Sequence, residues 1–138
     1  MWLWAIVRMN GLFEDAANRT KQGDLGEAKA IYELTRLGYD VSRTLFDSSK
    51  YDLVVDNGTL YRVQVKTTRH MRDGKYLVQL QTAGGNRKIN TIRRRQDSDY
   101  DFLFVVADNE DCWFIPTDAL TSRTQVTLGE LYTKFKLG

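Results

Sequence analysis

Hydrophobic and polar positions alternate most regularly in the middle of the chain. Residues 51–55 and 61–66 form two runs rich in β-branched side chains, and residues 56–59 separate them with the sequence Asp-Asn-Gly-Thr. An Asn-Gly pair between such runs is a strong hairpin signal, because both turn residues tolerate a positive φ. The pattern therefore predicts a β-hairpin.

The second strand of this hairpin carries a polar face. Val63 and Val65 point one way, whereas Gln64 and Lys66 point the other, since strand side chains alternate between the two faces. Asp52 begins the partner strand, where a hairpin of this length can bring it close to Gln64 and Lys66. We therefore expect a carboxylate, an amide oxygen and an ammonium group to converge.

Other segments show helical or strand periodicity. Residues 23–37 repeat apolar positions at helical spacing, with Asp24 as a plausible N-cap and Gly38 as the C-terminal cap. Further predicted strands span residues 39–46, 76–80, 101–107 and 113–115, and the strand 101–107 is apolar enough to be covered on both faces. This order predicts an α/β domain with a mixed sheet.

The remaining segments are less regular. Residues 81–86 read as a flexible turn, residues 87–96 as a helix or a loop, and residues 116–120 as a helical turn. Thr127 and Glu130 have the spacing of a capping box, which predicts a last helix through Lys136. Leu128, Leu131, Tyr132 and Phe135 would form its packed face.

The chain length of 138 residues predicts one domain, 1–138. We expect residues 1–20 to serve packing or oligomerisation, residues 21–116 to form the core, and residues 117–138 to form a C-terminal helical segment. The apolar run 1–7 is far shorter than the roughly 20 residues that span a bilayer, so no membrane association is expected. Translation from Met9 is an alternative.

The residue inventory excludes several chemistries. Cys112 is the single cysteine, which excludes an internal disulfide and a multi-cysteine zinc site. His70 is the single histidine, so the inventory argues against a zinc enzyme and against a Cys-His catalytic pair. Cys112 stands in an apolar run, which predicts a buried structural thiol.

Charge is distributed unevenly along the chain. Residues 62–95 contain ten basic residues and one acidic residue, whereas residues 96–138 contain eight acidic and three basic ones. A polyanionic partner for the middle of the chain follows, and we expect double-stranded DNA. The predicted DNA contacts are Ser48, Ser49, Lys50, Thr67, Thr68, Arg69, Arg87, Lys88, Arg93, Arg94 and Arg95. For Ser48, Ser49 and Lys50, a plain loop without contacts is the competing interpretation.

The convergent trio also has a chemical use. Carboxylate and amide oxygens are hard ligands suited to Mg²⁺ or Mn²⁺, and an ammonium group can hold a phosphate or orient an attacking water. The alternative from these residues alone is a strand with a solvated polar face.

The combination of these motifs resembles the PD-(D/E)XK nuclease superfamily. The resemblance rests on Gly26-Glu27-Ala28 in the helix, on Asp52 and on Gln64-Val65-Lys66, and it covers roughly residues 21–116. Within the superfamily the chain is most similar to small endonucleases encoded in group I introns, which carry Gln in the third motif. The resemblance implies a restriction-endonuclease-like mixed β-sheet core flanked by helices.

The resemblance also implies roles for individual residues. Glu27, Asp52 and Gln64 would hold Mg²⁺ (or Mn²⁺), and Lys66 would complete the catalytic set. By spacing alone, Glu27 could instead complete a capping box with Asp24. The chain departs from the family pattern at Tyr51, where Pro is usual, and at Gln64, where an acidic residue is usual. The second departure removes one negative charge and should weaken metal binding.

The activity implied is metal-dependent hydrolysis of DNA phosphodiesters by a site-specific homing-type endonuclease on duplex DNA. A chain of this size forms one active site, so cutting both strands predicts a homo-oligomer, a dimer or tetramer. We expect the protein in the cytoplasm, associated with the nucleoid through DNA. A Holliday junction resolvase is the alternative enzyme, although such enzymes usually carry Glu in the third motif. A non-catalytic DNA-binding module with a degraded site is the alternative outside enzymes.

Overall fold

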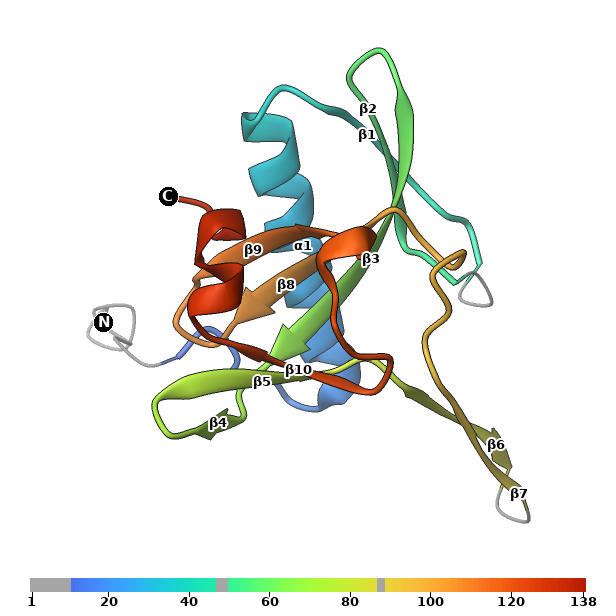
Figure 1. Ribbon diagram of the computed structural model, residues 1–138, viewed down its shortest axis with the longest axis vertical. Helices are drawn as coiled ribbons and strands as arrows, with labels where there is room; N and C mark the ends of the chain where they lie inside the picture. The colour runs from blue at the N-terminus through green and yellow to red at the C-terminus, as the bar shows by residue number, and fades with distance from the viewer. Residues whose placement is uncertain (1–10, 47–49, 87–88) are drawn as a thin grey trace, which may run out of the picture.

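The computed structural model describes residues 11–46, 50–86 and 89–138, and these residues form an α/β structure around a five-stranded mixed sheet (Figure 1). The strand order is β1 (Asp40–Arg43), β2 (Leu53–Asp56), β3 (Leu60–Thr68), β8 (Phe102–Ala107) and β9 (Cys112–Pro116). Strands β3 and β8 pair in parallel, whereas the β1–β2, β2–β3 and β8–β9 pairs are antiparallel. The predicted fold class and the predicted hairpin are confirmed.

Helix α1 (Arg19–Arg36) covers one face of this sheet (Figure 1). Its buried Leu34 packs in one apolar cluster with Val63 of β3 and Phe104 of β8. The helix begins one turn earlier than residues 23–37 predicted. Asn18 is the N-cap, with an extended backbone and a side-chain oxygen that accepts from the Lys21 N–H at 2.9 Å. Asp24 is therefore inside the helix and does not cap it.

A second, three-stranded sheet lies across the other face. Its strands are β4 (Met71–Arg72), β5 (Lys75–Gln79) and β10 (Gln125–Leu128), and the 3-10 helices η2 (Thr117–Ala119) and η3 (Glu130–Phe135) accompany it. Val78 of β5 packs in one cluster with Leu103 and Val105 of β8. Strand β8 is thus covered on both faces, as its apolar run predicts.

The prediction of a last helix from Thr127 is wrong. Thr127 lies in β10, opposite Leu77 of β5, and only residues 130–135 are helical, in 3-10 geometry. Strand pairing with β5 overrides the local capping-box signal, which a sequence window cannot weigh. Of the face predicted for that helix, Tyr132 is 2% exposed but Leu131 is 60% exposed. The helical turn at residues 116–120 is confirmed as η2.

The segment 81–96 also differs from its prediction. Instead of a flexible turn followed by a helix or loop, β6 (Thr82–Asn86) and β7 (Ile89–Arg93) pair antiparallel. Figure 1 shows this hairpin extending away from the rest of the molecule. The first strand is also shorter than predicted, because β1 ends at Arg43.

Candidate active site

Strands β2 and β3 separate at one end of the large sheet. Their last pair joins Leu53 with Val63. Strand β3 continues to Thr68, and from Val63 to Thr68 it pairs with β8. The β3 edge that faces away from β8 is therefore not covered by β2 beyond Val63. Side chains from both faces of the sheet can reach this edge.

Asp52 occupies the point of separation. Its backbone N–H donates to the Val63 carbonyl at 2.9 Å, and its side-chain Oδ2 accepts from the Val65 N–H at 2.8 Å. The carboxylate thus satisfies a backbone donor that a longer β2 would have used. Val65 lies between Gln64 and Lys66, so this hydrogen bond holds the carboxylate beside both.

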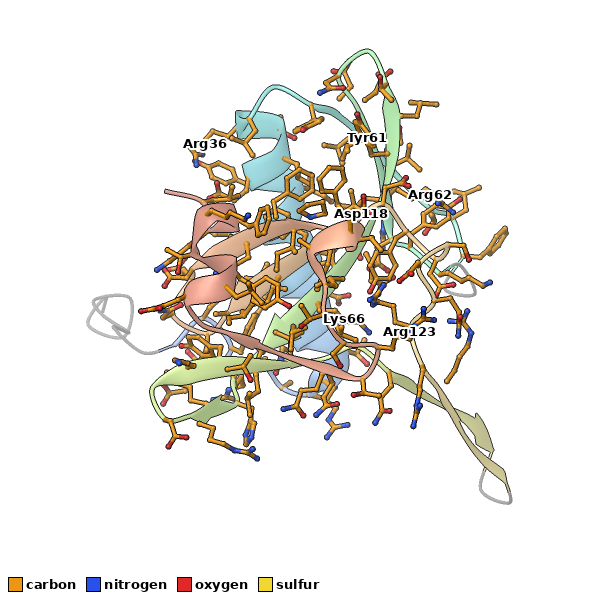
Figure 2. All side chains as sticks on the ribbon, viewed as in Figure 1. Arg36, Tyr61, Arg62, Lys66, Asp118 and Arg123 are labelled. Carbon is orange, nitrogen blue, oxygen red and sulfur yellow. The ribbon has the colours of Figure 1, made fainter. Side chains whose placement is uncertain are left out.

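Gln64 and Lys66 share the face of β3 that points away from α1. Thr67, which follows Lys66, points to the other face and contacts α1. Val63 also lies on that face and packs against α1. Figure 2 shows Lys66 at the opposite end of β3 from Tyr61. The Gln64 amide nitrogen lies 3.5 Å from the Val65 carbonyl oxygen, at the outer limit of a hydrogen bond. The alternation predicted from the sequence is confirmed.

Helix α1 approaches this end of β3 unusually closely. A Cβ placed on Gly26 would collide with the Thr67 side chain, so the contact requires glycine. One turn earlier, Gln22 Nε2 donates to Thr67 Oγ1 at 2.8 Å. These contacts bring Glu27, which follows Gly26, to the open edge of the sheet.

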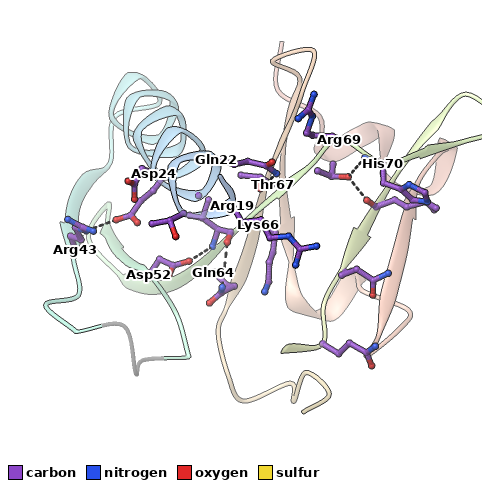
Figure 3. Close-up of a pocket in the computed structure, with 18 residues that line it drawn as sticks. Arg19, Gln22, Asp24, Arg43, Asp52, Gln64, Lys66, Thr67, Arg69 and His70 are labelled. Atoms are coloured by element: carbon purple, nitrogen blue, oxygen red, sulfur yellow. Dashed lines mark hydrogen bonds and ion pairs between the residues drawn. The ribbon is translucent and has the colours of Figure 1, made fainter. Parts of the chain in front are cut away.

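The four residues predicted as catalytic meet in one pocket of about 740 Å³ (Figure 3). Glu27 reaches it from α1, Asp52 from the start of β2, and Gln64 and Lys66 from β3. The pocket also contains residues that sequence analysis did not single out as site residues: Arg19, Thr20, Gln22, Gly23, Asp24, Arg43, His70, Leu77, Gln79 and Gln81. Arg19 and Gln22 were missed because the helix was predicted to begin too late.

Arg43 is the most consequential of these additions. Its Nε lies 2.6 Å from Glu27 Oε1, so the carboxylate is ion-paired within the pocket. Arg43 is the last residue of β1, and β1 lies beside β2 through a pair that joins Arg43 with Leu53. No local sequence signal links Arg43 to Glu27, because their proximity depends on the packing of α1 against the sheet.

Lys66 is partly buried at the centre of the pocket. Burial lowers its pKa from the ordinary value for lysine, and the negative charge of Asp52 opposes this shift only in part. A lysine with a lowered pKa in a polar pocket is a common feature of functional sites.

The donor set fits a hard divalent cation. Among the described residues there is no cluster of three or more His, Cys, Asp or Glu side chains that could hold a metal ion. The pocket offers two carboxylates, Glu27 and Asp52, and the neutral amide oxygen of Gln64, and all three are oxygen donors of the type that Mg²⁺ and Mn²⁺ prefer. This set carries one negative charge fewer than three carboxylates would.

The predicted DNA-contact residues fall into three groups. Ser48, Ser49, Arg87 and Lys88 lie outside the described residues. Lys50, Arg69 and Arg93 are substantially exposed and form ion pairs, Arg69 with Asp108 and the other two with Asp99. Arg94 is exposed. Lys50, Arg69, Arg93 and Arg94 together form the second group, and their cationic groups remain accessible to a polyanion.

The third group is occupied within the protein. Arg95 is 3% exposed, and its guanidinium bonds Asp97 and the Ser122 carbonyl. Thr68 is buried and donates to the Leu77 carbonyl, while Thr67 accepts from Gln22. The structure therefore gives Arg95 and Thr68 internal structural contacts in place of the predicted phosphate contacts.

Cys112 is buried beneath α1, as its apolar run predicts. Burial raises the pKa of its thiol to about 11, so the thiolate is scarce at neutral pH. Cys112 therefore packs as a small apolar side chain.

The family model described as "PD-(D/E)XK endonuclease" matches residues 17–134. That range includes helix α1, strands β2 and β3, and the four predicted catalytic residues Glu27, Asp52, Gln64 and Lys66. The chain belongs to the PD-(D/E)XK endonuclease family, so the resemblance to that superfamily inferred from the sequence is confirmed. It is a nuclease, and nucleases of this family use divalent metal ions.

Two particular proteins are similar to this chain. "Protein 5.3" of Escherichia phage T7 is 32% identical over 120 residues, which cover 83% of this chain and 94% of that protein. The structure of the bacterial homing endonuclease I-Ssp6803I is similar with a TM-score of 0.72 and 27% identity, and the match covers 83% of this chain and 80% of that one. Within the described residues, no helix has the length and apolarity needed to cross a membrane.

Proposed function

We propose that this nuclease is a Mg²⁺-dependent endodeoxyribonuclease that cuts duplex DNA at specific sites, as a homing endonuclease does. The observation that supports this most directly is the meeting of Glu27, Asp52, Gln64 and Lys66 in one pocket at the open edge of β3. The likeness to a homing endonuclease structure supports the finer assignment.

Glu27, Asp52 and Gln64 would hold the ion, and Lys66 would act on the substrate. When bound, Mg²⁺ supplies charge stabilisation at the phosphate and lowers the pKa of a bound water. In hydrolysis the water oxygen forms a bond to phosphorus, one phosphorus–oxygen ester bond breaks, and the leaving oxygen takes a proton. The Lys66 ammonium, which lines the same pocket, would orient the water and stabilise charge on the phosphate. The Val65 N–H keeps the Asp52 carboxylate in place.

The β6–β7 hairpin and its base would hold the flanking DNA. Strand β6 begins directly after Gln81, which lines the pocket, so the hairpin extends from the edge of the site (Figure 1). Arg93 and Arg94 stand at its base, and Lys50 joins Arg93 at Asp99. A two-stranded ribbon is narrow enough to enter the major groove, and basic residues beside it supply affinity for the phosphates. Ser48, Ser49, Arg87 and Lys88 remain predicted contacts.

A homo-oligomer, dimer or tetramer, would carry out double-strand cleavage. One chain provides one such pocket among its described residues, and a duplex has two scissile strands of opposite polarity. Two copies related by a two-fold axis would present one pocket to each strand. Sedimentation equilibrium with and without DNA tests this assignment.

The function is tested by cleavage of two substrates in parallel, a randomised duplex library and a synthetic four-way junction, each with and without Mg²⁺. Lys66→Ala is the active-site variant, and Lys134→Ala is the matched control, since it removes the same charge from η3. We expect the wild type and Lys134→Ala to cut a narrow set of duplex sequences only with Mg²⁺, and Lys66→Ala to cut none.

Other outcomes would redirect the assignment. Symmetric cutting of the junction alone would identify a junction resolvase. Binding of DNA that is indifferent to Mg²⁺, with no cutting of either substrate, would indicate a DNA-binding protein with an inactive site.

A further inference from the structure

A guanidinium from β1 lies beside the acidic side chain that α1 brings to the pocket. Arg43 Nε is 2.6 Å from Glu27 Oε1, as the dashed line in Figure 3 marks. The Glu27 side chain is 20% exposed, whereas that of Arg43 is 66% exposed. The Arg43 guanidinium is therefore the more solvent-exposed partner, so it is the one that can exchange this contact for water or for another anion.

Arg43 has room to move. Besides the main pocket it lines a neighbouring hollow of about 390 Å³, together with Asp24, Glu27, Ala28 and Ile31. The backbone of Arg43 pairs with Leu53, the residue that follows Asp52, so the side chain starts from a point next to the proposed site. A planar guanidinium matches a phosphate as well as it matches a carboxylate.

On the basis of the proposed function, we propose that Arg43 is a positioning residue with two partners. In the metal-free protein its guanidinium is the internal counter-ion of Glu27, and divalent metal binding displaces it onto a backbone phosphate of the DNA. The displacement follows from charge, since a divalent ion at Glu27 attracts the carboxylate more strongly and repels the guanidinium. Metal binding and DNA binding then strengthen each other, and the coupling is reciprocal.

A purely structural role for Arg43 predicts the opposite behaviour. If Arg43 only orients Glu27, then removing it frees the carboxylate and weakens metal binding. If Arg43 competes with the metal, then removing it strengthens metal binding. The two roles therefore differ in the sign of a measurable affinity change.

The first experiment is calorimetric titration of Mn²⁺ into DNA-free wild type, Arg43→Ala and Arg36→Ala. Arg36 is the matched control, because it bonds Glu33 on the same helix at 2.8 Å and lies outside the pocket. We expect Arg43→Ala to bind Mn²⁺ about three- to tenfold more tightly than the wild type, as the loss of an exposed competing charge predicts. Arg36→Ala should match the wild type.

The outcomes separate this inference from the proposed function. Unchanged or weaker Mn²⁺ binding by Arg43→Ala, with normal binding by the wild type, overturns the role of Arg43 alone. Absence of Mn²⁺ binding in all three proteins overturns the proposed metal site and the role of Arg43 with it.

The second experiment measures the transfer to DNA. Duplex affinity is measured against salt concentration, with and without saturating Mn²⁺, in a Lys66→Ala background that prevents cutting. Each phosphate neutralised steepens the slope of log affinity against log salt by about 0.9. We expect Mn²⁺ to steepen this slope by about 0.9 more when Arg43 is present than when it is replaced by Ala. Equal steepening in both proteins overturns the transfer.

Discussion

Asp52 directly precedes strand β2 and Asp56 is its last residue, and the two aspartates differ in what surrounds them. Asp56 Oδ1 accepts from the Gly58 N–H at 2.8 Å in the turn that closes the hairpin. Asp52 Oδ2 accepts from the Val65 N–H at 2.8 Å where β2 and β3 separate. The hydrogen bonds are alike, but only Asp52 shares a pocket with Glu27, Gln64 and Lys66. The candidate site thus arises because β3 continues past the end of its partner.

Substituting both aspartates by asparagine tests this contrast most strongly. In each variant the amide oxygen can still accept the backbone hydrogen bond, so both should fold. We expect Asp52→Asn to lower the rate of DNA cleavage by about 100- to 1000-fold, the range for removing one electrostatic contact to a transition state. Asp56→Asn should cut at the wild-type rate. Single-turnover cleavage measures both, and equal losses would show that the site lies elsewhere.

Gln64→Glu tests the metal-binding role of the end of the hairpin where β2 and β3 separate, which we call the open end. A third carboxylate would restore the charge that the family pattern usually has, and we expect Mg²⁺ affinity to rise about tenfold. The measurement is calorimetric titration without DNA. Gln79→Glu adds the same charge elsewhere in the pocket and serves as the control. An equal gain in both variants would mean that net charge, and not a ligand at position 64, determines the affinity.

The lowered pKa of Lys66 predicts a pH dependence at the open end. If the ammonium form acts on the substrate, then cleavage is fully present below this lowered pKa and is lost as pH rises through it, before the ordinary lysine pKa of 10.5. Lys66→Arg keeps its charge, so its remaining activity should not fall in that window. Cleavage rates measured against pH test this. A wild-type loss that persists in Lys66→Arg would assign the titration to another group.

The same shift has a consequence for stability. Burial disfavours the charged form, so Lys66 lowers the free energy of unfolding at neutral pH, and this penalty disappears as pH rises towards 10.5. We expect Lys66→Met to be more stable than the wild type at pH ~7. Urea denaturation at several pH values checks this, and a difference that does not shrink with rising pH would contradict it.

Substitutions in the turn that joins β2 to β3, the closed end of the hairpin, should change stability and leave cleavage unchanged. Gly58 has a φ of +107°, which a residue with a Cβ adopts only with strain. We expect Gly58→Ala to lower the free energy of unfolding by about 1 kcal/mol and to leave cleavage unchanged. Thermal unfolding and a cleavage assay suffice. Gly23→Ala is a control without positive φ, and it should not destabilise the protein.

Local patterns in the sequence predict a substantial part of the candidate site. Asp52, Gln64 and Lys66 belong to one hairpin, where the period of two and the Asn-Gly turn fix which side chains share a face. Glu27 was assigned through the family resemblance, because its local pattern fits a capping box equally well. The structure shows that Asn18 caps the helix instead.

Other features depend on contacts between distant segments. Arg95 lies in the most basic run of the chain, yet it is buried, and its guanidinium donates to the Ser122 carbonyl beyond β9 as well as to nearby Asp97. Thr127 and Glu130 carry a helix-start signal, yet pairing with β5 makes Thr127 part of a strand. In both cases a long-range interaction prevails over a local preference.

The sequence by itself therefore determined the hairpin, the basic stretch followed by an acidic one, and the polar face of β3, because each depends on neighbours in the chain. Only the tertiary structure decided where β2 and β3 separate, how closely α1 approaches Thr67 through Gly26, and that Arg43 meets Glu27. These depend on packing between segments far apart in sequence, and side-chain periodicity carries no information on such packing.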